Sequence, residues 1–410
     1  MSLLDNQLEK YAELAVKNGI NVQKGQILVV SAPISAISFV RVVAKKAYEA
    51  GAKHVHFRWS DDDLTLIQYT NAPDDSFTEY PEWEAKSLEM LADLGAGFLD
   101  IRIPNPDLLT NVDPERIANY NKAQAIAWKP YRQARMNDRV SWCIVSVPSE
   151  NWAAKVFPDL SPEEGVTRLW ETIFQMTRAD KPDPVKAWDE HKQNLAEKAD
   201  FLNQKKYKKL HYKAPGTDLA IEFHPKHLWC SAAAVNDEGH DFIANIPTEE
   251  VYTLPLKTGV NGTVTSTMPL NYSGNLIEEL SLTFKEGRIV DFSAKSGYET
   301  LKRLIETDEG SHYLGEVALV PHNSPISQSG LIFYNTLFDE NASCHVAIGK
   351  AYPTTLEGGA KMSEQELEAH GVNDSLNHVD FMIGSAELDL DGELSDGTRE
   401  PLMRNGLWVI

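Results

Sequence analysis

The stretch QILVVSA, residues 26 to 32, decides the fold of the first half of the chain. Its short apolar run predicts a buried strand. Apolar residues then recur at helical spacing from Phe39 to Ala47, and Gly51 ends that helix. The stretch KHVHFRW, residues 53 to 59, is the next expected strand. Because strand, helix and strand follow in this order, we expect a β-α-β unit with parallel pairing.

The same alternation continues to about residue 180. The stretches GFLDIRI, residues 97 to 103, and VSWCIVSVP, residues 140 to 148, predict two further strands. A capping box that begins at Ser161 predicts the start of a helix. The polar, proline-containing stretch ADKPDP, residues 179 to 184, is the best linker candidate. We therefore predict an α/β domain with parallel strands over residues 1–184.

Strand patterns dominate the second half of the chain. The stretch from Leu280 to Ala294 predicts a hairpin that turns at KEG, and ELDLDGEL predicts a final hairpin around Asp391 and Gly392. Helical patterns interrupt the strands in two places, one of them after a capping box at Ser363. We therefore predict a β-rich α+β domain over residues 185–410, and the whole chain as a two-domain mixed α and β protein.

Composition narrows the classes of partner. The formal net charge of the 410 residues is −21, which argues against nucleic acid and anionic membranes. Three widely spaced cysteines predict no disulfide framework and suit a reducing compartment. The first residues lack the pattern of a signal peptide, and no apolar run is long enough to span a membrane. We expect a cytoplasmic protein.

Common nucleophile and phosphate motifs are absent from the sequence. No glycine-rich phosphate loop follows the first strand, and there is no G-x-S-x-G elbow. Cys344 stands beside His345, but neighbours in a strand point to opposite sides, which disfavours a thiol dyad. His54 and His56 alternate with apolar residues and are expected on a solvated strand face.

The stretch NHVDFMIGS, residues 377 to 385, carries two polar residues inside an apolar strand pattern. His378 and Asp380 share a strand face, and a buried carboxylate needs a hydrogen-bonding partner, water or a metal. Similar acid or imidazole residues occur in three other apolar segments. Mixed carboxylate and imidazole ligands suit zinc, cobalt or manganese, and bridging carboxylates favour a two-metal centre. Spacing alone leaves open whether the segments converge, and each residue alone also fits a core hydrogen bond or a solvated strand end.

Four blocks resemble the signatures of the thermophilic metalloaminopeptidase family, of the aminopeptidase T and aminopeptidase S type. They are NIPTEEVYTLP, GEVALVP followed by NSPIS, LFDENASCHVAIGKAYP and NHVDFMIGS. The resemblance implies a homodimer that encloses its sites, and two divalent ions per subunit, zinc, cobalt or magnesium. It also implies Tyr352 at the active site. The metal ligands that it implies are Glu250, Glu316, Glu340, His345, His378 and Asp380.

The function implied is a metal-dependent aminopeptidase that hydrolyses short peptides with a free N-terminus through a two-metal-activated water. Glu316 would bridge the ions, Tyr352 would stabilise the oxyanion, and Glu316 or Glu250 would move the proton. Glu249 is a weaker candidate for holding the amine. The alternatives are another dinuclear metallohydrolase acting on amides or phosphoesters, a non-catalytic metal-binding protein, or a small-molecule-binding protein that uses the α/β half.

Overall fold

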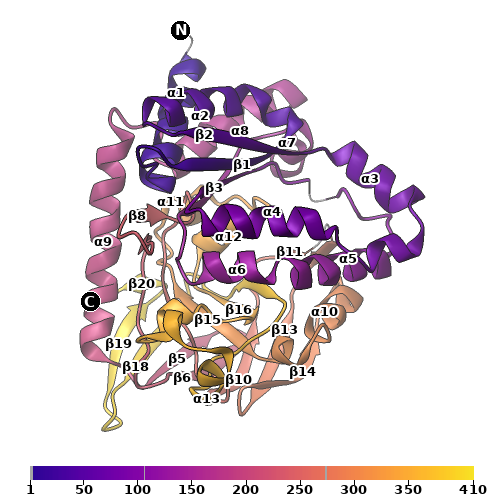
Figure 1. Ribbon diagram of the computed structural model, residues 1–410. Coiled ribbons are helices and arrows are strands. Elements are labelled where there is room, and N and C mark those ends of the chain that lie inside the picture. Colours follow the sequence, from indigo (N-terminus) through magenta and orange to yellow (C-terminus); the bar gives the residue numbers. More distant parts are fainter. Residues whose placement is uncertain (1–2, 106, 273–274) are drawn as a thin grey trace. The chain divides into compact units, whose positions relative to one another are not determined.

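The computed structural model describes residues 3–105, 107–272 and 275–410 (Figure 1). The chain forms two compact units, one of residues up to Gln193 with Ala232–Thr248, the other of Asn194–Ser231 with Glu249–Ile410. The expected boundary after residue 184 lies at the start of α9 (Pro184–Lys205), whereas the units divide farther along, inside that helix. A parallel sheet in the first unit and antiparallel sheets in the second confirm the predicted fold class.

The first unit is built around a parallel sheet of order β2-β1-β3-β4, in which β4 (Trp142–Ser146) is an edge strand. β1 (Ile27–Pro33) pairs in parallel with β2 (His54–Ser60) on one side and with β3 (Gly97–Arg102) on the other. The crossover between β1 and β2 is α2 (Ile37–Glu49), as the sequence predicts. Buried side chains follow one another along the middle of β1, as expected of a strand covered on both faces.

The edge strand β2 and the start of one helix also form as their local sequence predicts. On β2, Val55 is buried, while His54 and His56 are exposed as predicted. The capping box at Ser161 is present and opens α8 (Pro162–Met176).

None of the helices in the described part of the chain combines the length and hydropathy of a membrane span. The remaining helices of this unit are α1 (Leu3–Leu14), α3 (Asp62–Asn71), α4 (Glu82–Asp93), α5 (Pro114–Ala127), α6 (Lys129–Met136), α7 (Glu150–Val156) and α8 (Pro162–Met176).

The segment Ala232–Thr248 belongs to the first unit although the chain reaches it later. It forms a hairpin of β7 (Ala233–Val235) and β8 (Asp241–Ile243) and then runs beside β4 (Trp142–Ser146). The Ile144 N–H donates to the Ala244 carbonyl at 2.8 Å, and the Ile246 N–H donates to the Ile144 carbonyl at 3.0 Å. The segment supplies backbone hydrogen-bond partners to the edge of the parallel sheet, so it belongs with the first unit. One domain boundary along the chain therefore cannot separate the two units.

The second unit contains an antiparallel sheet of eight strands and another of four. The predicted hairpin is present and turns at Glu286 and Gly287, which both have positive φ. Its helices are α10 (Tyr298–Ile305), α11 (Pro325–Ser329), α12 (Thr336–Asp339) and α13 (Glu364–Ala369). In spatial order the eight strands are β14 (Arg288–Ser293), β13 (Ser281–Lys285), β10 (Val260–Thr265), β6 (Thr217–Glu222), β5 (Lys209–Ala214), β18 (Asp389–Glu393), β19 (Arg399–Arg404) and β20 (Leu407–Trp408).

The predicted turn at Asp391 and Gly392 is wrong. Both residues lie within β18, which pairs with β5 and β19. The chain turns instead near Gly397, which has φ +85° and follows Asp396, whose side chain accepts the Thr398 N–H. A Cβ at Gly392 would lie 2.5 Å from the ring of Tyr207. Gly392 therefore permits close packing of an aromatic ring on the strand, which local sequence does not distinguish from a turn.

Replacing Gly392 by alanine is expected to destabilise the second unit by about 1–3 kcal/mol, because the new methyl group overlaps a fixed ring. Urea denaturation followed by tryptophan fluorescence measures this change. Gly165→Ala is the matched control, since a Cβ there lies 3.4 Å from its nearest heavy atom, within α8. Equal stability of the Gly392 variant and the natural protein would contradict the packing explanation.

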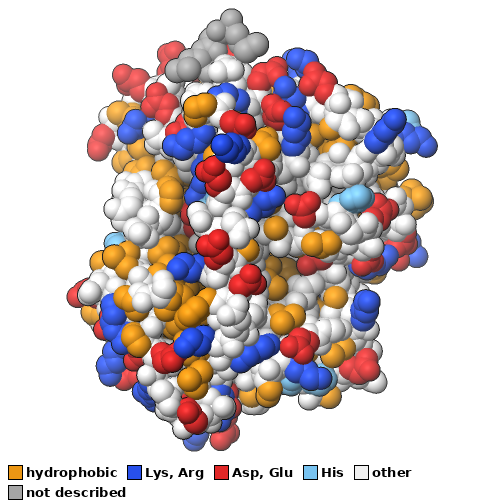
Figure 2. Space-filling view, turned by 90° about the vertical axis from the view of Figure 1, so that its left-hand side faces the viewer, with side chains coloured by type: hydrophobic (Ala, Val, Ile, Leu, Met, Phe, Trp, Pro, Cys, Tyr) orange, Lys and Arg blue, Asp and Glu red, His pale blue; other side chains and the backbone are white. Residues whose placement is uncertain are grey.

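Surface charge is mixed on the face shown in Figure 2. Acidic and basic side chains are interspersed there, with hydrophobic side chains between them. The large negative net charge is therefore not concentrated in a single acidic patch on this face.

Candidate metal centre

The four-stranded sheet of the second unit carries most of the predicted ligands on one face. Its order is β17-β16-β15-β9, with β17 (His378–Met382), β16 (His345–Gly349), β15 (Leu314–Leu319) and β9 (Val251–Thr253). Glu316 lies opposite Ala347, and Ala347 lies opposite Asp380. Directly opposite residues share a sheet face, and so do residues two apart along a strand. His345 and His378 therefore lie on the same face as this row.

Small residues and a bulge make room for the cluster. Ala347 and Gly349 occupy the His345 face of β16, between the two strands that carry the carboxylates. The register of β15 shifts by one residue between Leu314 and Glu316, so that Gly315 forms a bulge. A Cβ at Gly315 would lie 2.3 Å from the Lys350 carbonyl oxygen, so only glycine fits there.

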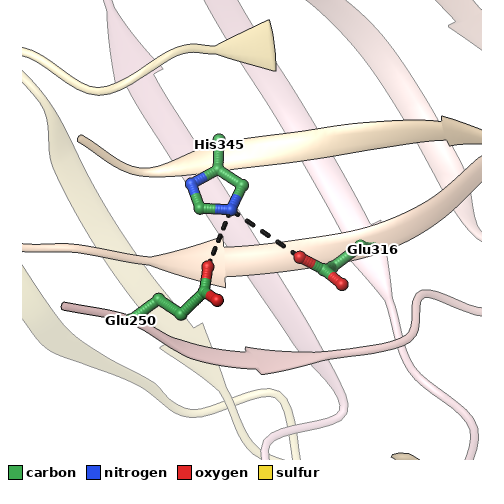
Figure 3. A group of neighbouring side chains, drawn as sticks. All are labelled: Glu250, Glu316 and His345. Atoms are coloured by element: carbon green, nitrogen blue, oxygen red, sulfur yellow. Dashed lines mark ion pairs between the residues drawn. The ribbon is translucent and has the colours of Figure 1, made fainter. Parts of the chain in front are cut away.

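Two triads of side chains that could hold a metal ion share one carboxylate. The first is Glu250, Glu316 and His345, and the second is Glu316, His378 and Asp380; within each triad the ligand atoms lie within 4.8 Å of one another. His345 Nε2 lies 2.9 Å from Glu250 Oε2 and 3.6 Å from Glu316 Oε1 (Figure 3). On the other side, His378 Nε2 lies 3.7 Å from Glu316 Oε2 and 3.7 Å from Asp380 Oδ1. The two oxygens of Glu316 thus face two different imidazoles.

Both histidines have their other ring nitrogen held by the backbone. His345 Nδ1 donates to the Ser343 carbonyl at 3.1 Å, and His378 Nδ1 donates to the Lys350 carbonyl at 2.6 Å. A carbonyl oxygen can only accept, so the proton of each neutral ring resides on Nδ1. The Nε2 lone pairs then point at carboxylates, which is the tautomer and orientation of metal-ligating histidine.

The buried oxygens of the cluster require a cation. Within the described chain, Glu250 Oε2 and Asp380 Oδ1 are buried without a hydrogen bond. Although Glu250 Oε2 is within hydrogen-bond distance of His345 Nε2, both atoms are acceptors when the ring is neutral. Two facing acceptors repel unless a proton or a metal ion lies between them. The donor set therefore fits a divalent metal.

The ionisation of these groups indicates the same need for positive charge. Burial, together with the charge of Asp380, raises the pKa of Glu316 to about 7. Burial and the charges of Asp380 and Glu250 raise the pKa of Glu340 well above its usual value. Burial opposes protonation of His345, but hydrogen bonding to Glu250 and Glu316 outweighs it and raises the pKa of the ring. Without a metal, the cluster takes up protons to offset its excess negative charge.

The other predicted site residues lie beside the triads. Glu340 is buried in the 3-10 turn Glu340–Ala342, close enough for the charges of Glu250 and Asp380 to act on it. The ring of Tyr352 packs edge-on against His378, with ring centroids 5.0 Å apart, and against Tyr252, with centroids 6.0 Å apart. Among the described residues neither triad includes Glu340. Its role as a ligand stays a prediction.

Cys344 does not pair with His345. Its Sγ lies 3.4 Å from the Val320 carbonyl oxygen and 3.7 Å from Met403 Sδ, whereas His345 Nε2 faces the carboxylates. Burial raises the pKa of the thiol to about 11, so it carries no nucleophilic thiolate at neutral pH. This agrees with the expectation from strand alternation.

Sequence reasoning missed the residues that shape the site without being ligands. They are the small residues Ala347 and Gly349, the carbonyls of Ser343 and Lys350, and the buried amide of Asn341. The stretch HVAIG did contain a signal, because small residues recur at every second position after His345.

A buried face of carboxylates and imidazoles, with one carboxylate shared between two triads, is the type of site found in metalloenzymes. The chain matches the family model described as "Thermophilic metalloprotease (M29)" over residues 4–408. The chain therefore belongs to the thermophilic metalloprotease family. This confirms the resemblance found in the four sequence blocks, and it makes the chain a metallopeptidase.

Relatives align along the entire chain. It is 57% identical over 409 residues to Aminopeptidase 2 of Geobacillus stearothermophilus, and the alignment covers 100% of this chain and 99% of the relative. It is 43% identical over 410 residues to Aminopeptidase T of Thermus thermophilus, and the alignment covers 100% of both proteins. The structure of wild-type AmpT from Thermus thermophilus is similar with a TM-score of 0.92 at 42% identity, covering 99% of this chain and 100% of that one.

Proposed function

We propose that the chain is an aminopeptidase that removes N-terminal residues from short peptides and uses two divalent ions, zinc, cobalt or magnesium. One observation carries this proposal: the two oxygens of Glu316 face His345 and His378 separately. A carboxylate in this position suits a bridging ligand between two ions. The relatives named aminopeptidases support the reaction class.

The two triads support one set of candidate ligands for each ion. Glu250, Glu316 and His345 would hold one ion, and Glu316, His378 and Asp380 would hold the other. Glu340, whose ionisation is opposed by the charges of Asp380 and Glu250, would be an additional ligand. Bound divalent ions would supply a water of lowered pKa and polarisation of the scissile carbonyl. In the neutral tautomer both histidines present Nε2 as the ligand atom, and a proton that Nε2 of His345 carries in the metal-free cluster would be released when an ion binds.

The remaining chemistry falls to two carboxylates of the triads and to side chains beside them. Glu250 and Glu316 are the carboxylates beside His345 that can take the proton released by the attacking water. Tyr352, packed on His378, is the candidate donor of a hydrogen bond to the developing oxyanion. The free amine of the peptide, positively charged at neutral pH, suits a site with this many carboxylates. Glu249, buried and next to Glu250 in the chain, is the weaker candidate for holding it.

The decisive experiment compares peptides with a free and an acetylated N-terminus, with and without a chelator. We expect amino acids to be released from the free peptide only, and release to stop after chelation and return when Zn²⁺, Co²⁺ or Mg²⁺ is added back. Circular dichroism of the chelated protein controls for unfolding. Cleavage of the acetylated peptide, or activity indifferent to chelation, would refute the proposal.

A homodimer in the cytoplasm is part of the same proposal. It rests on the family resemblance in the sequence, and on the absence of a disulfide framework among the three cysteines. Light scattering coupled to size-exclusion chromatography measures the mass directly, and a mass of one chain, 45.8 kDa, would contradict the dimer.

A further inference from the structure

A buried asparagine connects the segments that carry two of the carboxylates. Asn341 is fully buried and follows Glu340 in the 3-10 turn. Its Oδ1 accepts the backbone N–H of Glu249 at 2.7 Å, and its Nδ2 donates to the Leu337 carbonyl at 3.0 Å. One side chain thus links the residue before Glu250 to the helix α12 that precedes Glu340.

The partners of this amide determine its orientation. A backbone N–H can only donate and a backbone carbonyl can only accept, so Oδ1 must face Glu249 and Nδ2 must face Leu337. The same Nδ2 lies 3.5 Å from Glu340 Oε1. The amide therefore aims a donor toward the carboxylate of Glu340 while it holds the backbone next to Glu250.

The backbone of Asn341 joins a third segment. The hydroxyl of Ser324 donates to the Asn341 carbonyl at 3.1 Å, and the same hydroxyl caps α11 by accepting the Ser327 N–H. Ser324 lies on the loop that follows β15, the strand that carries Glu316. Three ligand-bearing segments that are distant in sequence thus meet at one residue.

We propose that Asn341 is a positioning residue of the metal centre. Its carboxamide sets the separation and orientation of Glu250 and Glu340, and through them the affinity for the ion held by Glu250, Glu316 and His345. The inference rests on the proposed function for the identity of the ligands.

The geometry makes the effect specific for one ion. The side-chain amide of Asn341 contacts only the Glu249, Leu337 and Glu340 segments among the described residues. His378 is oriented by the Lys350 carbonyl instead, and Asp380 by its place in β17. Loss of the amide should therefore weaken the first ion and leave the second in place.

The experiment titrates the metal-free protein with Co²⁺ and follows visible absorption. The variants are Asn341→Leu, which keeps the volume of the side chain, and Asn341→Ala, which leaves room for a bridging water. We expect one of two Co²⁺ ions to bind about 10–100-fold more weakly, the usual cost of losing an outer-shell partner. At one ion per chain, the spectrum should match that of Glu250→Gln and differ from that of Asp380→Asn.

Asn236→Ala is the matched control in the other unit. Asn236 is also buried, donates to Ser141 Oγ at 3.0 Å and accepts the N–H groups of Glu238 and His240. Its removal should leave both Co²⁺ affinities unchanged. Unchanged affinity in the Asn341 variants, or equal weakening of both ions, would overturn the inference.

Two further outcomes keep the test decisive. If both Asn341 variants fail to fold, Ser324→Ala removes only the hydroxyl that holds the Asn341 carbonyl, and it should weaken the same ion less strongly; unchanged binding would overturn the inference. Failure of the proposed function is seen separately, because it would appear as no release of amino acids by the natural protein, whatever its Co²⁺ titration shows.

Discussion

Replacing Glu316 by glutamine is expected to remove both metal ions and to lower kcat/KM by about 10³-fold or more, since water at the site then keeps its ordinary pKa. The two oxygens of Glu316 face the two imidazoles, so one substitution affects both triads. A neutral amide of nearly the same shape removes a negative charge from a buried, carboxylate-rich cluster. The variant should therefore be at least as stable as the natural protein from which the metal has been removed.

Metal content by mass spectrometry, peptide hydrolysis and thermal denaturation together test this expectation. Glu400→Gln is the matched control in the same unit. Its carboxylate pairs with Lys205 at 2.6 Å and accepts the hydroxyl of Tyr207 at 2.7 Å, away from the triads. That control should keep its metal and its activity. Full metal content in the Glu316 variant would disprove the shared-ligand assignment.

Replacing Tyr352 by phenylalanine is expected to lower kcat by about 10²–10³-fold, the usual cost of losing one oxyanion donor. The substitution keeps the ring that packs on His378 and Tyr252. Metal content and KM should therefore change little, because the lost interaction forms only in the transition state.

Steady-state kinetics on a free peptide, with metal analysis of the same sample, separate the roles of Tyr352. Tyr252→Phe is the control, since its ring packs against that of Tyr352 with centroids 6.0 Å apart. Its kcat should fall less. An unchanged kcat in the Tyr352 variant would exclude the oxyanion role, and loss of metal would make the residue structural.

Much of the first unit was predictable because its signals are local. The apolar run of β1, the helical spacing of α2 and the capping box at Ser161 each depend on residues close in sequence. The return of Ala232–Thr248 to this unit was not predictable in the same way. It depends on pairing with β4, a strand far away in the chain.

The error at Gly392 has a related cause. Asp-Gly favours a hairpin turn in an isolated segment, but here the packing of Tyr207 on β18 requires the glycine. The turn near Gly397 has an equally ordinary local signal, the Asp396 side chain accepting the Thr398 N–H. Local chemistry permits both turns, and only the pairing of β18 with β5 and β19 distinguishes them.

By itself, the sequence determined which side chains share a strand face. Alternation places His378 with Asp380, and His345 with the small residues Ala347 and Gly349, because successive side chains in a strand point to opposite sides. Glu250, Glu316 and Glu340 were candidates as acidic residues in apolar segments, and the family blocks implied them as ligands, but no spacing rule brought these residues together.

The tertiary structure alone decided that the candidate ligands converge. If the register of Leu314 continued, Glu316 would lie opposite Val346 and face away from His345; the bulge at Gly315 places it opposite Ala347 instead. A one-residue shift in register moves a side chain to the other face of a sheet, and register depends on hydrogen bonds between strands that are distant in sequence. The shared position of Glu316 between two imidazoles therefore follows from backbone pairing, which local residue preferences do not specify.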